Sequence, residues 1–79
     1  MRREGETMQP TQPEPGLYRH YKGGFYTVTG LARHSETEEW LVLYRAEADG
    51  SLWVRPQAMW VETVVHEGRV VARFGLVSG

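Results

Sequence analysis

Cationic and aromatic side chains are concentrated in three short stretches of the sequence, and such side chains are suited to binding a ligand. The stretches are 19–22 (Arg-His-Tyr-Lys), 32–37 (Ala-Arg-His-Ser-Glu-Thr) and 52–56 (Leu-Trp-Val-Arg-Pro). Each ends a run of β-strand character, where simple alternation would require only apolar residues toward the core. Guanidinium groups and aromatic rings can together hold a planar or anionic ligand. Because the chain is small, we expect the three stretches to form one ligand-facing patch.

Trp53 and Arg55 are predicted to project from the same face of a strand, because residues two positions apart in an extended segment share one face. Leu52 and Val54 then occupy the opposite face. A Trp and an Arg side by side make a stacking platform for a nucleobase, a proline or an aromatic ring. In the structural alternative, Trp53 is simply a core residue and Arg55 pairs with Glu62. The sequence leaves both interpretations open.

Arg33 and His34 lie where a long β-like run enters a turn. The hydroxyls of Ser35 and Thr37 can bond backbone groups of that turn, and Glu36 can pair with Arg33. A locally satisfied turn is therefore the simpler interpretation. The functional interpretation places Arg33 and His34 at a loop-end site for an anionic or planar ligand.

Arg19 and Tyr21 also share one strand face and would extend the platform, whereas Lys22 is expected to flank a hairpin. Tyr44 adds an aromatic ring from the middle of the chain. The predicted ligand-binding residues are therefore Arg19, Tyr21, Arg33, His34, Tyr44, Trp53 and Arg55.

No catalytic constellation is visible, so we expect a binding module and not an enzyme. His34 and Ser35 are adjacent and would point to opposite faces, which prevents a nucleophile pair. The three histidines lack ligand spacing and the chain has no cysteine, so we expect no metal site. The glycines at 23–24 join two strands and open no helix, so no phosphate-cradling loop is expected. No cofactor is expected.

The charge balance bears on the partner. The 79 residues carry a net charge of −1, and from residue 16 onward seven Lys and Arg match seven Asp and Glu. Strong non-specific binding of nucleic acid requires a basic surplus, so only a local basic face remains open. No apolar run is long enough to span a membrane, and the start of the chain lacks the apolar stretch of a secretory signal. We expect a cytoplasmic protein that does not bind membranes.

Turn residues divide the chain into short strands. We expect a flexible, proline-rich tail over 1–15 and a single domain over 16–79. Turns at 23–24, 49–50 and 67–68 separate strand-like runs at 17–22, 25–34, 40–46, 51–55, 60–65 and 70–74. Proline ends the fourth run, and 56–59 is long enough for only one 3₁₀ turn. The prediction is an all-β domain, a small five- to six-stranded SH3-like or Sm-like barrel with the 3₁₀ turn before the fifth strand.

The second run, 25–34, is too long to stay straight. At about 3.3 Å per residue it would extend for roughly 33 Å, whereas a domain of about 60 residues is only roughly 25–30 Å across. We expect it to bend at Gly30, where a bend costs least. Uninterrupted alternation would place Val28 on one face and Leu31 and Arg33 on the other.

The sequence resembles a small bacterial family of unknown function, DUF1653, over nearly all of 16–74. The resemblance rests on the stretch 16–23, Tyr26, Val28, Gly30, the stretch 32–37, Val42, the stretches 44–46 and 52–56, Met59, Glu62, Val64 and the pair 73–74. It implies a free-standing single-domain bacterial protein with an Sm-like barrel, and it implies no activity, cofactor or catalytic residue. Trp60 stands where family members often have Phe.

Two classes of function follow. In a nucleic-acid- or nucleotide-binding module, stacking and phosphate contacts would come from Arg33, His34, Tyr44, Trp53 and Arg55. In a protein-interaction module, aromatic residues and sheet edges would bind a peptide or a second copy of the chain. The neutral charge favours the second class, whereas the clustering of Arg, His and Trp favours the first. We expect RNA or a nucleotide, with a protein partner or self-association as the alternative.

Overall fold

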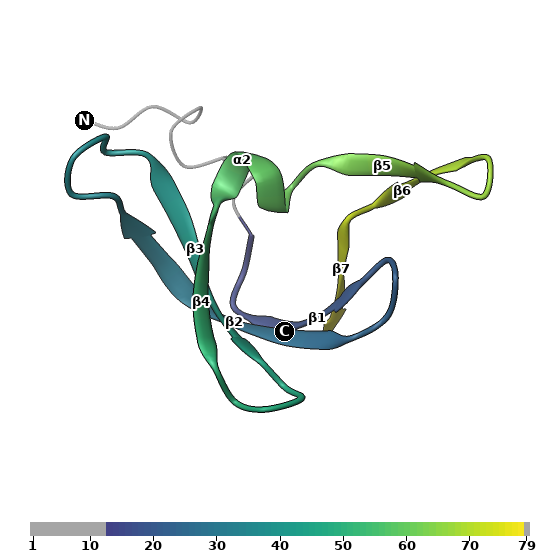
Figure 1. The fold of residues 1–79 in the computed structure, drawn as a ribbon, viewed down its shortest axis with the longest axis horizontal. Coiled ribbons are helices and arrows are strands. Elements are labelled where there is room, and N and C mark those ends of the chain that lie inside the picture. The colour runs from purple at the N-terminus through teal and green to yellow at the C-terminus, as the bar shows by residue number, and fades with distance from the viewer. Residues whose placement is uncertain (1–12, 79) are drawn as a thin grey trace.

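The computed structural model describes residues 13–78, in which seven strands and one helical turn follow each other along the chain (Figure 1). They are β1 (Gly16–His20), β2 (Phe25–Arg33), β3 (Trp40–Ala46), β4 (Leu52–Pro56), α2 (Gln57–Trp60), β5 (Thr63–His66), β6 (Arg69–Ala72) and β7 (Phe74–Ser78). All strand pairs are antiparallel, which confirms the prediction of an all-β fold. Most of the predicted tail, residues 1–12, lies outside the described residues.

The strands form two sheets. Five of them are ordered β4-β3-β2-β1-β7, and β5 and β6 form a separate hairpin. Figure 1 shows this hairpin reaching outward beyond α2 before the chain returns to the sheet as β7. The hairpin has no ladder with either edge strand, so the described strands are not closed into a barrel. The SH3-like or Sm-like barrel therefore stays a prediction.

A β-bulge in β2 changes which residues face the core. Val28 and Gly30 have consecutive partners on β3, so Thr29 is an extra residue in the ladder. A bulge bends its strand, and this one lies directly before the position where a bend was predicted. Because one residue is inserted, Leu31 and Arg33 lie on the same face as Val28, and Leu31 packs against the core. The face expected for these two residues from uninterrupted alternation was wrong.

The C-terminal third also differs from expectation. Residues 57–60 form one α-helical turn instead of the predicted 3₁₀ turn, with the Val61 N–H donating to the Gln57 carbonyl at 3.1 Å. Trp60 ends this turn and does not begin a strand, and β5 starts only at Thr63. The predicted strand over 70–74 is divided at Arg73, whose backbone bonds to Glu62 and Tyr21. β7 is therefore a seventh strand that the sequence did not predict.

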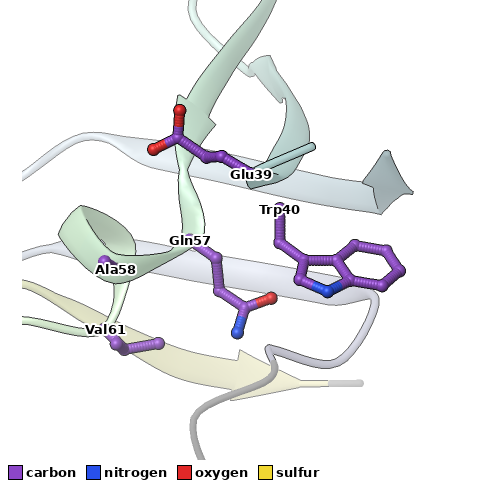
Figure 2. Close-up of a pocket in the computed structure, with 5 residues that line it drawn as sticks. All are labelled: Glu39, Trp40, Gln57, Ala58 and Val61. Carbon is purple, nitrogen blue, oxygen red and sulfur yellow. The ribbon is translucent and has the colours of Figure 1, made fainter. Parts of the chain in front are cut away.

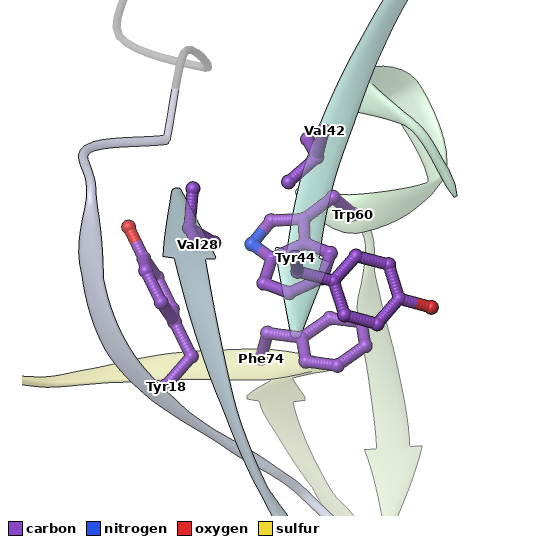
Figure 3. Packing of buried hydrophobic residues seen from close by; sticks show 6 residues of the cluster. All are labelled: Tyr18, Val28, Val42, Tyr44, Trp60 and Phe74. Atoms are coloured by element: carbon purple, nitrogen blue, oxygen red, sulfur yellow. The ribbon is translucent and has the colours of Figure 1, made fainter. Parts of the chain in front are cut away.

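The core is mainly aromatic and lies between the sheet and α2 (Figure 3). We call the sheet face that carries it the inner face. Trp60 is 2% exposed and stacks on Phe74 with 3.7 Å between ring centroids and 3° between planes. The other buried residues are Tyr18, Val28, Val42 and Tyr44. Buried aromatic rings of this size dominate the stability of a small core. The stacking of Trp60 on Phe74 therefore holds α2 against the sheet.

Candidate functional site

Trp53 and Arg55 both lie on the inner face, beside the aromatic core. Trp53 is paired with Tyr44 across the β3–β4 ladder, and Arg55 is paired with Val42. Directly paired residues project from the same face of a sheet, so the alternation predicted for β4 is confirmed. Trp53 is 55% exposed, which rules out a purely core role for its indole.

These residues line a cavity of about 350 Å³ at the end of β3. We call it the aromatic pocket. Its walls are Tyr26, Tyr44, Ala46, Ala48, Asp49, Ser51, Trp53 and Arg55. The rings of Tyr26 and Tyr44 meet edge to face, with centroids 5.6 Å apart. Since Tyr44 is buried, the pocket wall is continuous with the rigid core.

A hydrogen-bond chain from the β3–β4 turn holds the Trp53 indole in place. Its Nε1–H donates to Ser51 Oγ at 2.6 Å, and that hydroxyl donates to Asp49 Oδ1 at 2.7 Å. The Ser51 backbone N–H donates to the same carboxylate oxygen at 3.0 Å. The bonds from the Ser51 hydroxyl and backbone lower the pKa of Asp49, so the carboxylate is charged at neutral pH. Gly50, with φ of +74°, permits this tight turn.

Arg55 connects the pocket to the core. Its Cζ lies 5.5 Å from the centroid of the Phe74 ring, a cation–π contact. Glu62, the predicted partner of Arg55, instead pairs with Arg73 at 3.0 Å. Within residues 13–78 Arg55 makes no ion pair, and its Nε is buried without a hydrogen-bond partner. Because the Nε is buried, the terminal nitrogens of the guanidinium are the atoms that can bond a ligand.

His20 also packs on Phe74, with ring centroids 5.0 Å apart. Its Nδ1 accepts the Lys22 N–H at 3.1 Å. Partial burial, followed by the positive charges of Arg73, Arg55 and Lys22, lowers the pKa of His20. Sequence reasoning did not select His20 as a site residue. The available clue was its strand face, because it alternates with the buried Tyr18 whereas Arg19 does not.

Arg19 and Tyr21 do not extend the Trp53 platform. Arg19 is paired with Phe25 on the sheet face opposite Tyr18 and therefore points away from the pocket. Tyr21 follows β1 and lies against His66 of the hairpin, with ring centroids 5.3 Å apart. The predicted single patch thus does not include them.

Arg33 and His34 lie at the opposite end of β3, in a turn whose groups bond each other. Arg33 pairs with Glu38 at 3.6 Å, and not with Glu36 as predicted. The guanidinium Cζ lies 4.5 Å from the Trp40 ring centroid. His34 Nδ1 accepts the Glu36 N–H at 3.1 Å. The structural interpretation of this turn accounts for these contacts.

A second cavity of about 380 Å³ adjoins this turn. We call it the Trp40 cavity, and its lining residues are Glu39, Trp40, Gln57, Ala58 and Val61 (Figure 2). Figure 2 shows the Glu39 carboxylate pointing away from the indole. Because Arg33 already covers the Trp40 ring, this cavity offers less free aromatic surface than the aromatic pocket.

The described part of the chain shows no group of three or more His, Asp or Glu side chains arranged to hold a metal ion. Among residues 13–78, no helix is long and apolar enough to cross a membrane.

The fold and site define an all-β protein with an aromatic pocket beside an arginine at the end of a bent antiparallel sheet. Residues 16–76 match the family described as a protein of unknown function, DUF1653. The chain belongs to the DUF1653 family, as its sequence resemblance predicted. A crystal structure of a DUF1653 protein from Bordetella bronchiseptica is similar to it, with 38% identity and a TM-score of 0.76 over 82% of this chain and 87% of that chain. Curated proteins offer no match.

Proposed function

We propose that the aromatic pocket binds a nucleobase, carried either by a free nucleotide or by single-stranded RNA. The observation that carries this proposal is the state of Trp53, which is 55% exposed and yet held by the hydrogen-bond chain through Ser51 to Asp49. An indole that is already ordered loses little rotamer entropy when a ligand stacks on it. Stacking of a base on an aromatic side chain contributes about 1–3 kcal/mol.

The groups around Trp53 match the chemistry of a base. The Tyr26 and Tyr44 rings supply apolar walls, and the cavity of about 350 Å³ lies within the range of small-ligand sites, roughly 300–1,000 Å³. Arg55 can donate hydrogen bonds to base carbonyls, whereas the Asp49 carboxylate can accept from exocyclic amines. Stacking rings with few polar groups are typical of proteins that recognise unpaired bases.

The balanced charge of the chain fits a small ligand better than a duplex. Seven cations and seven acids from residue 16 onward favour contact with one or a few nucleotides, because extended phosphate backbones require many cations. As part of the same proposal, the bent sheet is an open form of an SH3-like or Sm-like barrel in a cytoplasmic protein. Sm-like barrels often bind RNA, and that support is by analogy of fold.

Binding of a labelled oligouridylate, followed by fluorescence anisotropy at about 50 mM salt, tests the proposal. Trp53→Ala is expected to weaken binding by about 1–3 kcal/mol through lost stacking. Trp40→Ala is the matched control, because it removes a half-exposed indole from the Trp40 cavity and is expected to leave affinity unchanged. Arg55→Ala should reduce the slope of log affinity against log salt by about 1. Circular dichroism first establishes that each variant is folded.

Two results would contradict the proposal. The first is no binding of RNA or of any nucleotide at about 50 mM salt, where counterion release favours association. The second is a folded Trp53→Ala variant that binds RNA normally but changes its self-association in sedimentation experiments. That second result would support the protein-interaction class instead.

A further inference from the structure

Two basic side chains, His20 and Arg55, pack on the Phe74 ring next to the aromatic pocket, and the charges of Lys22 and Arg73 act on His20. We call His20, Lys22, Arg55 and Arg73 the basic cluster. His20 and Arg55 both pack on the ring of Phe74, at 5.0 and 5.5 Å respectively. Arg73 directly precedes Phe74 in the chain, and the Lys22 ammonium lies 5.7 Å from the centroid of the Tyr21 ring, which packs on His20 with centroids 4.7 Å apart. The four residues come from three separate segments, so only the tertiary structure brings them together.

The positive charge of the cluster is only partly balanced. Glu62 pairs with Arg73, whereas Lys22 and Arg55 make no ion pair within the part of the chain that the structure describes. The Nε atoms of Arg55 and Arg73 are both buried without a hydrogen-bond partner. Partial burial is the largest cause of the lowered pKa of His20, and the charges of Arg73, Arg55 and Lys22, the other members of the cluster, lower it further.

We propose that the basic cluster binds the phosphate group of the ligand whose base occupies the aromatic pocket. The inference rests on the proposed function for the position of the base. Arg55 belongs to both sites, and Tyr26 lines the pocket while packing edge to face on Phe74 at 5.8 Å. A phosphate beside the His20 imidazole would accept hydrogen bonds from the guanidinium of Arg55 and from the ammonium of Lys22.

His20 contributes a donor and a proton-linked charge. Because its Nδ1 accepts the Lys22 N–H, its Nε2 carries the proton in the neutral ring and can donate to the anion. A bound dianion favours the protonated imidazole. The remaining groups near the ring are Tyr21, with His66 behind it, and the paired Arg73 and Glu62. None of these places an unpaired carboxylate against His20, so anion binding and proton uptake are coupled.

Titration with sodium sulfate tests the anion site without a nucleobase. Sulfate is suitable because its charge does not change between pH 5 and pH 8. NMR of the imidazole signals should show sulfate raising the pKa of His20 by about one unit. His34 is the internal control, since its Nδ1 also accepts a turn N–H at 3.1 Å but it lies outside the cluster. Lys22→Gln should weaken sulfate binding several-fold while leaving the aromatic pocket intact.

A second experiment compares the affinities of uridine 5′-monophosphate and uridine at pH 6. The phosphate should tighten binding about tenfold, which is the effect of one charge-assisted contact of about 1.4 kcal/mol. His20→Asn should remove most of this advantage and leave uridine binding unchanged, because the Asn carbonyl can still accept the Lys22 N–H. His34→Asn is the matched control and should retain the advantage. A short oligouridylate that binds more tightly than the mononucleotide would show that the bound phosphate belongs to an RNA strand and not to a free nucleotide.

The outcomes separate the two proposals. If uridine perturbs Trp53 but sulfate shifts His20 no more than His34, the anion site is wrong and the base pocket stands. If sulfate shifts His20 selectively but neither uridine nor its monophosphate perturbs Trp53, the anion site stands and the base pocket is wrong. Equal loss of sulfate binding in the His20→Asn and His34→Asn variants would also overturn the inference.

Discussion

At the scale of single residues, His20 and His34 illustrate how surroundings separate two side chains with the same local role. Each accepts a backbone N–H two residues ahead through Nδ1, at 3.1 Å in both cases. Both therefore stabilise a turn. Only His20 also packs on the core residue Phe74, where partial burial, followed by the charges of Arg73, Arg55 and Lys22, lowers its pKa. The surroundings of the two histidines differ because of residues that lie far away in sequence, Arg55 and Phe74.

The lowered pKa of His20 predicts that stability depends on pH near neutrality. The unfolded chain takes up a proton on this imidazole at a higher pH than the folded protein does, so stability is greatest above about pH 6.5 and decreases as pH falls through that value. Urea unfolding between pH 5.5 and 8 measures the effect. His20→Asn should have a flatter profile than the unmodified protein.

Between pH 5.5 and pH 8, the effect of His20 on stability is separated from the titration of the carboxylates. Glu47 and Asp49 have pKa values lowered by their hydrogen bonds, so both stay ionised throughout this range. A profile of the unmodified protein that runs parallel to that of His20→Asn would show that the imidazole has the same pKa in the folded and unfolded states.

At the scale of elements, the bulge in β2 is the feature that shapes the sheet. It inserts Thr29 between residues whose partners on β3 are consecutive. The insertion turns Leu31 toward the core and places Arg33 beside Trp40. Alternation within a strand follows from backbone geometry, but a bulge depends on how two strands pair. This explains why the bend of β2 was predictable and the face of Leu31 was not.

Gly30 is expected to tolerate a side chain despite its place beside the bulge. A Cβ added there meets no atom within 4 Å, and its φ is not in the left-handed region. Gly30→Ala should therefore leave the free energy of unfolding unchanged or raise it by up to about 1 kcal/mol, because glycine loses more backbone entropy on folding. Denaturant unfolding measures the change.

Gly50→Ala is the matched control for this substitution. Its Cβ also meets open space, but its φ of +74° strains any other residue, so it should destabilise by about 1 kcal/mol. A Gly30→Ala variant as unstable as Gly50→Ala would mean that β2 bends at Gly30 itself and not at Thr29.

At the scale of the whole molecule, the β5–β6 hairpin is held by fewer contacts than the strands of the larger sheet. The hairpin exposes Val65 and Val70 and forms no ladder with the larger sheet. Its described attachments are the Arg73–Glu62 contacts and the packing of Tyr21 on His66. A two-stranded sheet is only marginally stable by itself.

The hairpin should accordingly open without unfolding of the sheet. Native-state hydrogen exchange should give lower opening free energies for amides of β5 and β6 than for those of β2 and β3, where Val28 and Val42 are buried. Exchange of the hairpin amides only at the global unfolding free energy would contradict this division of the molecule.

The sequence alone determined the positions of most strands and turns and the faces of Tyr44, Trp53 and Arg55, because turn residues and two-residue alternation act locally. Tertiary structure decided the rest. It placed Trp60 at the centre of the core from a helical turn, separated Arg33 from Trp53, and joined His20 to Arg55 over Phe74. Those placements depend on strand register and on packing between distant segments, and no local pattern of residues specifies either.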